Sequence, residues 1–121
     1  MFKVKQMVTS LESEILECLK SKGEIVTYTV AADLFYEGQI PVVAYLVLDG
    51  HIHFLKGRTI KETITGGNLV GAKELMSNTH AIMSAQIMPK TQVCFLSKSD
   101  IHEILEEENE LAEQLDQIIN F

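Results

Sequence analysis

Arginine is almost absent from this chain of 121 residues, which contains Arg58 and no other. Its ten basic side chains face 17 acidic ones, so the formal net charge at pH 7 is −7. A surface that binds nucleic acid needs clustered basic side chains to neutralise phosphates, and the sequence offers no such cluster. We therefore expect no direct binding to nucleic acid.

Cysteine and long apolar segments are scarce as well. Cys18 and Cys94 lie far apart and form no C-x-x-C motif, so we expect two reduced, buried thiols and no disulfide. The longest apolar run, residues 40–48, is too short to span a bilayer, and no signal peptide follows the N-terminal lysines. These features predict a cytoplasmic protein that does not contact membranes.

The acidic charge is concentrated at the C-terminal end. Residues 100–121 carry eight acidic side chains and no Lys or Arg, whereas residues 1–99 hold nine acidic side chains against ten basic ones. The hydrophobic fraction of 46% is ordinary for a globular protein. We expect residues 1–121 to form one domain.

Periodicity divides the chain into three zones. Residues 9–21 predict an N-terminal helix, with Thr9 and Glu12 at capping-box spacing and an apolar face that begins at Leu11. Residues 24–97 alternate with a period of two and contain turn signals at Asp49-Gly50, Gly57-Arg58 and Pro89-Lys90. Several short strands at this spacing predict a mainly β fold, a sandwich or a small barrel.

Residues 99–120 predict one long C-terminal helix that starts at Ser99. Its apolar residues keep a 3-4 spacing, which Glu108 interrupts. Such a face either packs on the chain's own barrel or forms a dimer seam, and we expect the seam because the helix is long for so small a barrel. The seam residues are Ile101, Ile104, Leu111, Leu115 and Ile118.

Four motifs in order give the chain a resemblance to a known family. They are "DLFYEGQ", "VAYLVLDGHIHFL", "IKETITGGNLVGAKELM" and "SAQIMPKTQVCFLSKSDIHEIL", which together cover about residues 11–115. In this order and spacing they resemble the cyclic nucleotide-binding domain family, of the catabolite-activator type. The resemblance implies a jelly-roll β-roll with an N-terminal helix, a short cassette helix and a long C-terminal helix, here as a stand-alone copy.

The resemblance also implies a phosphate-binding cassette, which this chain carries in degenerate form. In the family a Gly-Glu pair opens the cassette, and about ten residues later an arginine binds the cyclic phosphate, followed by a small or hydroxyl residue. Gly71 matches the glycine, but Ala72 stands at the glutamate. Met83 stands at the arginine and Ser84 after it, and shifting the alignment to Ile82 or Ala81 supplies no base either.

Some groups that bind anions remain. Backbone N–H groups around Gly71, the Ser84 hydroxyl, Lys73 and a nearby His80 are available to hold an anion weakly. Met83 is expected to fill the core or to line an enlarged apolar pocket. The candidate ligand-binding residues are Val70, Gly71, Ala72, Lys73, Glu74, Leu75, His80, Met83 and Ser84.

A rival interpretation is a metal protein of the cupin type. His51 and His53 lie two residues apart in a predicted strand, so both rings face the same side. Cupins also need a nearby carboxylate and a distant histidine, and Gly57 and Arg58 occupy the carboxylate spacing here. Two ligands do not complete a metal site, so we expect no metal and no catalytic centre.

Two functions remain open from the sequence. The first is a non-enzymatic interaction or dimerisation module that lacks the usual anchors, does not bind cyclic AMP in the usual way, and engages a second copy or another protein. The alternative is a small-molecule sensor that binds a cyclic nucleotide, weakly, or another effector in the β-roll pocket. No resident cofactor is expected in either case.

Overall fold

The computed structural model describes residues 8–10 and 12–120 of the chain. The strands are β1 (Val8–Ser10), β2 (Glu24–Tyr28), β3 (Ala32–Phe35), β4 (Ala44–Asp49), β5 (His51–Lys56), β6 (Thr59–Thr65), β7 (Asn68–Val70), β8 (Ser84–Ile87) and β9 (Thr91–Leu96). The helices are α1 (Ser13–Lys22), α2 (Ala72–Ser77), α3 (Lys98–Leu105) and α4 (Glu110–Asn120).

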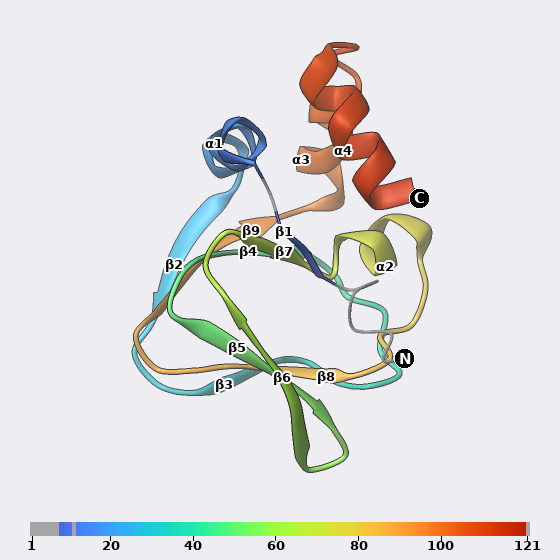
Figure 1. Cartoon of the computed structure of the whole chain (residues 1–121). Coiled ribbons are helices and arrows are strands. Elements are labelled where there is room, and N and C mark those ends of the chain that lie inside the picture. Colours follow the sequence, from blue (N-terminus) through green and yellow to red (C-terminus); the bar gives the residue numbers. More distant parts are fainter. Residues whose placement is uncertain (1–7, 11, 121) are drawn as a thin grey trace.

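Two antiparallel sheets face each other, as Figure 1 shows. One has five strands in the order β1-β7-β4-β9-β2, and the other has four in the order β3-β8-β5-β6. The turns expected at Gly50 and Gly57 join β4 to β5 and β5 to β6, and both glycines have positive φ. The predicted mainly β roll is therefore confirmed.

Strand β4 is buried on both faces, which explains its uninterrupted apolar sequence. Tyr45 and Val47 point between the two sheets, where they join the core of the roll. Ala44 and Leu46 point to the other side, where they join a second core beneath the helices. A strand covered on both faces needs apolar residues at successive positions rather than at alternate ones.

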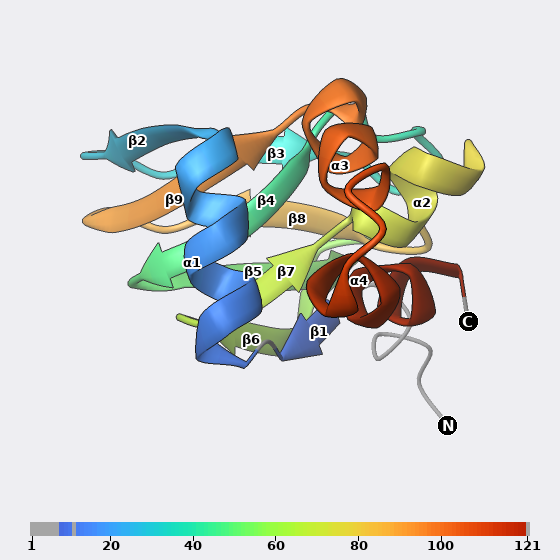
Figure 2. The same ribbon diagram turned by 90° about the horizontal axis from the view of Figure 1, so that it is seen from above.

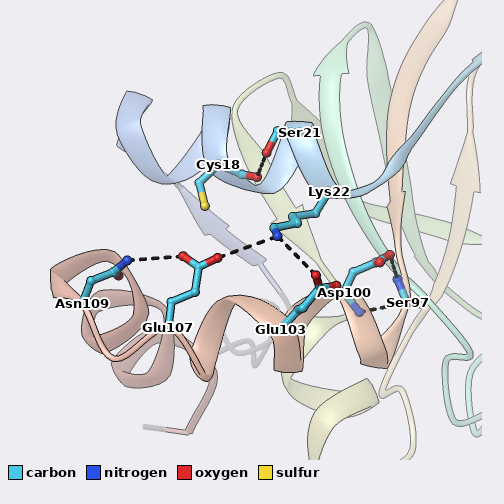
Figure 3. Close-up of polar contacts among 8 residues, drawn as sticks. All are labelled: Cys18, Ser21, Lys22, Ser97, Asp100, Glu103, Glu107 and Asn109. Carbon is cyan, nitrogen blue, oxygen red and sulfur yellow. Dashed lines mark hydrogen bonds and ion pairs between the residues drawn. The ribbon is translucent and has the colours of Figure 1, made fainter.

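Three helices cover the outer face of the five-stranded sheet. Figure 2, seen from above, shows α1, α3 and α4 lying across the strands of this sheet, with α2 beside them. Ile15 and Leu19 of α1 are buried in the outer core. Lys22 at the end of α1 forms ion pairs with Glu103 (3.4 Å) and Glu107 (3.7 Å), which link α1 to α3 and the residues that follow it (Figure 3).

The prediction for the N-terminal helix was wrong at its start. Helix α1 begins at Ser13, and Thr9 lies in β1, which pairs with β7. Glu12 is the N-cap, and its side chain makes no capping hydrogen bond. Leu11 falls outside the described residues. The roll therefore gains a strand before the region 24–97 that the sequence assigned to it.

The prediction of a single long C-terminal helix over residues 99–120 was also wrong, because the structure has two helices there. Helix α3 begins one residue before Ser99, the predicted start, and Ser97 is its N-cap. The Ser97 hydroxyl accepts a hydrogen bond from the Asp100 N–H (3.0 Å), and the Asp100 carboxylate accepts one from the Ser97 N–H (2.9 Å), as Figure 3 shows. This reciprocal pair is a capping box.

The chain turns between α3 and α4 at residues 106–109. Glu108, which interrupts the apolar spacing, has a positive φ of 53°. The Asn109 side chain then accepts a hydrogen bond from the Ala112 N–H (2.9 Å), as an N-cap of α4 does. The break lets α4 fold back against α3 and α2, so the apolar residues of both helices point to one core.

That core already contains most of the predicted dimer seam. Ile101, Ile104 and Leu115 are at most 2% exposed within a single chain. Leu111 and Ile118 are half-buried and pack against the same cluster. Three of the five seam residues therefore serve the chain's own packing. Within the part of the chain that the structure describes, no helix is long and apolar enough to cross a membrane.

Candidate functional site

The candidate cassette begins where β7 ends. Gly71 follows Val70 with φ 80° and ψ 4°, a left-handed conformation that glycine adopts without steric cost, and α2 starts at the next residue. The Gly71 carbonyl accepts a hydrogen bond from the Leu75 N–H (3.0 Å), which closes the first helical turn. The predicted glycine and short helix are therefore present, and no side chain caps the helix at Gly71.

The first helical turn directs its apolar side chains away from the roll. Ala72 and Leu75 are 5% and 6% exposed and belong to the outer core, together with Leu115 and Ile119 of α4. Ala72 stands where the resemblance expects a glutamate. Its methyl group takes part in packing, so the side chain at this position offers a ligand no hydrogen-bonding group.

The interior of the roll is apolar at the position expected for the arginine. Met83 is 1% exposed and belongs to the cluster between the two sheets, which also contains Val70, Phe35 and Tyr45. Burial raises the pKa of Tyr45 to about 12, and its hydroxyl donates a hydrogen bond to the Leu34 carbonyl (3.3 Å). Met83 is thus core, one of the two roles that the sequence left open.

Ser84 is tied to the loop between β3 and β4. Its hydroxyl accepts a hydrogen bond from the Glu37 N–H (2.9 Å). The same loop forms two backbone hydrogen bonds with Ala81, from the Gly38 N–H (2.8 Å) and to the Gln39 carbonyl (2.7 Å). These contacts hold the segment before β8 against the loop, and the Ser84 oxygen already has a backbone partner.

A lysine that the sequence did not single out lies beside this segment. Lys56, at the end of β5, donates to the Glu37 carboxylate (2.7 Å) and to the Ile82 carbonyl (3.1 Å). Lys56 lowers the pKa of Glu37 by this hydrogen bond and by its charge. Because Lys56 is more than 25 residues from Ile82 in sequence, only the pairing of β5 with β8 brings them together.

Glu74 is a buried acid on the cassette helix. It is 7% exposed, and its Oε1 atom has no hydrogen-bond partner in the structure. Burial raises the pKa of Glu74, while its own backbone N–H and the charge of Lys73 act in the opposite direction. Sequence reasoning placed Glu74 in the cassette without anticipating burial, because an acid in a first helical turn is usually solvated.

The remaining candidates lie nearer the surface. Lys73 is half-buried in the first turn of α2, and His80 is exposed in the segment that leads to β8. The nine candidate residues therefore divide between the roll interior, the outer core and the surface. Val70 and Met83 lie in the core of the roll, and Ala72 and Leu75 lie in the outer core.

His51 and His53 lie on the outer face of the four-stranded sheet. Ile52 and Phe54, which alternate with them, are fully buried between the sheets. The pKa of His53 is lowered by burial and by the neighbouring His51. Within residues 8–10 and 12–120, no group of three or more His, Cys, Asp or Glu residues is placed to hold a metal. The cupin interpretation gains no further ligand from the fold.

Solved structures with a similar fold agree with the family resemblance seen in the sequence. One match is a protein solved in work on a cyclic-GMP-dependent signalling pathway of bacterial phytopathogenesis, with 15% identity and a TM-score of 0.79 over 88% of this chain and 89% of that chain. Another is the catabolite activator protein of Thermus thermophilus, with 20% identity and a TM-score of 0.72 over 91% of this chain and 54% of that chain. The chain has the fold of a cyclic nucleotide-binding domain.

Other comparisons agree on this cyclic nucleotide-binding domain fold. A cyclic nucleotide-binding-like protein from Brucella abortus is 28% identical, with a TM-score of 0.66 over 80% of this chain and 87% of that chain. The chain spans about half the length of the Thermus protein. No protein-family model and no curated protein sequence matches the chain, so the cyclic nucleotide-binding domain fold is evident here from three-dimensional structure.

Proposed function

We propose that this chain is a non-enzymatic regulatory domain that does not hold cyclic nucleotides in the usual way and acts through contacts with proteins. One observation carries the proposal. Met83, at the position where the resemblance expects an arginine, is buried in the apolar core between the sheets. A cyclic phosphate would meet packed hydrocarbon there instead of a cation.

The expected loss of affinity for cyclic nucleotides is large enough to support this proposal. A hydrogen bond to a charged group contributes roughly 1.5–3 kcal/mol, and each 1.4 kcal/mol corresponds to about tenfold in affinity. Lack of a bidentate arginine and of a glutamate therefore lowers the expected affinity by several powers of ten. The Ser84 hydroxyl accepts from the Glu37 N–H and keeps its own O–H to donate, but one neutral hydrogen bond does not replace a bidentate, charged arginine.

The alternative function is a small-molecule sensor. It is supported by the first turn of α2, where Gly71 provides no side-chain cap and backbone N–H groups can meet an anion. Lys56 adds a positive charge beside the segment that leads to β8. An anionic effector would compete with the Glu37 carboxylate for the Lys56 charge, and the Ser84 O–H would be a further donor.

A titration of thermal stability separates the two functions. We expect millimolar cyclic AMP, cyclic GMP and cyclic dinucleotides to leave the unfolding midpoint unchanged, as linear AMP does. A ligand at 100 times its dissociation constant would add about 2.7 kcal/mol of stability, enough to raise the midpoint by several degrees. A saturable shift with a cyclic nucleotide, absent with linear AMP and reduced in Ser84→Ala, would replace the proposal with the sensor.

The proposed contact with a protein partner involves α4 and the residues that precede it. Glu106, Glu107 and Glu108 precede α4 and are exposed, and Leu111 and Ile118 leave part of their apolar surface uncovered. Homodimerisation through α4 is part of the proposal. Because Ile101, Ile104 and Leu115 are core residues, a dimer contact would rest on Leu111 and Ile118.

A further inference from the structure

Two imidazoles stand side by side on the outer face of the roll. The ring centroids of His51 and His53 are 5.2 Å apart, and the ring planes are inclined at 64°. Both residues belong to β5, in which alternate side chains point to the same side. Both are half-buried, so they remain accessible from solvent.

The separation of the rings suits binding to one ion. With metal–nitrogen distances of about 2.0–2.1 Å, two imidazoles on a tetrahedral ion have ring centroids roughly 5 Å apart. The observed centroid separation of 5.2 Å is therefore compatible with both rings binding one ion. A strand also holds the two rings more rigidly than a loop would.

A neighbouring hydroxyl orients one of the rings. The Nδ1 atom of His53 lies 3.0 Å from Oγ1 of Thr63, the residue opposite it on β6. When this nitrogen carries the proton and donates to Thr63, Nε2 carries the lone pair that can bind a metal. Histidines that bind metals commonly donate their other ring N–H to a fixed acceptor, which sets the orientation of the ring.

The neighbours of the pair across the sheet are uncharged. His53 is paired with Thr63 on one side and with Gln86 on the other, and His51 is paired with Thr65. None of these side chains repels a cation. Because no third His, Cys, Asp or Glu completes a cluster among the described residues, water would fill the other coordination positions.

We propose, in departure from the sequence-based expectation of no metal, that His51 and His53 form a weak, two-ligand surface site for a divalent transition metal ion. Imidazole ligands favour zinc, nickel and copper over magnesium and calcium, which prefer oxygen. With two protein ligands the site binds more weakly than a structural zinc site that has four. The inference does not depend on the proposed function, since the site lies on the outer face of the sheet and the cassette residues do not contribute to it.

Nickel titration of the tag-free protein tests the site. Isothermal calorimetry should give one Ni²⁺ ion per chain and no binding of Mg²⁺. Paramagnetic Ni²⁺ should broaden the amide resonances of β5, β6 and β8 first in a ¹H–¹⁵N spectrum. His51→Gln and His53→Gln keep a polar side chain at a half-exposed position, and each should lower the affinity at least about tenfold.

His80→Gln and His102→Gln are the matched controls, because both histidines are exposed and lie outside β5. We expect both to bind Ni²⁺ as the parent protein does. The proposal is overturned if the His51 and His53 variants keep the parent affinity, if broadening centres on another region, or if no Ni²⁺ binds at millimolar concentration. The dispersion of the spectrum without metal reports whether each variant is folded.

Discussion

At the scale of single residues, Glu74 stands out among the described residues, because its charged form conflicts with its buried environment. A carboxylate loses hydration on burial, and this loss is offset only when hydrogen bonds or opposite charges replace the water. The Oε1 atom of Glu74 has no such partner. The charge of Lys73 reduces the resulting rise in the Glu74 pKa but does not cancel it.

The raised pKa of Glu74 predicts a specific pH dependence of stability. The folded protein holds the Glu74 proton more tightly than the unfolded chain, so this residue's contribution is greatest below the ordinary glutamate pKa. That contribution is lost as the pH rises through the folded-state pKa. Glu74→Gln should therefore be more stable than the parent at neutral pH, and the difference should shrink in acid.

Chemical denaturation at several pH values between 4 and 8 measures this effect. Glu113→Gln is the control, because Glu113 is exposed on α4 and should change stability little at any pH. Parallel pH profiles for Glu74→Gln and the parent would show that the Glu74 carboxyl is solvated or paired in solution.

Single residues of the candidate cassette also differ in how much of their role the sequence reveals. The sequence revealed that Ala72 and Met83, which stand at the two positions the family resemblance gives to charged residues, are uncharged. It did not reveal that Met83 enters the core of the roll or that Ser84 binds the Glu37 N–H. Those facts depend on contacts between residues that are distant in sequence.

At the scale of elements, the C-terminal region shows how caps determine where helices begin. Apolar spacing alone predicted one helix over residues 99–120, because α3 and α4 share a compatible period. The Ser97–Asp100 capping box and the Asn109 N-cap instead define two helices. Both caps are short-range sequence signals. Ser97 stands three residues before Asp100, the spacing of a capping box, and Asn109 stands directly before the first residue of α4.

The two serines at the start of α3 give a direct test of the capping assignment. Ser97→Ala removes a side-chain acceptor from the Asp100 N–H and should lower the free energy of unfolding by about 0.5–2 kcal/mol. Ser99→Ala changes an exposed residue within the first turn and should alter it by less than about 0.5 kcal/mol. Urea denaturation measures both, and a larger loss for Ser99→Ala would restore Ser99 as the cap.

At the scale of the whole molecule, the two cores decide which surfaces remain for partners. The inner core fills the space between the sheets, and the outer core is sealed by α1, α3 and α4. Figure 2 shows these helices spread over one face of the five-stranded sheet. An apolar face that looked available for a dimer is therefore mostly used within the chain.

The proposed homodimer predicts a limited contact. Sedimentation velocity should show association that increases with protein concentration and is lost when Leu111→Gln and Ile118→Gln are combined. Ile25→Gln is the control, because Ile25 is an exposed apolar residue on β2, away from α4. A monomer at every concentration would remove self-association from the proposal and leave contact with a different protein.

The sequence by itself determined a mainly β fold, the positions of several turns, the short helix after Gly71 and the uncharged residues Ala72 and Met83. These features follow from local periodicity, glycine geometry and residue identity. Only the tertiary structure decided that Met83 is core, that Lys56 lies beside Ile82, that Glu74 is buried and that the C-terminal apolar residues face inward. The reason is that burial and pairing depend on which distant segments meet, and strand order and helix direction settle that only in the folded chain.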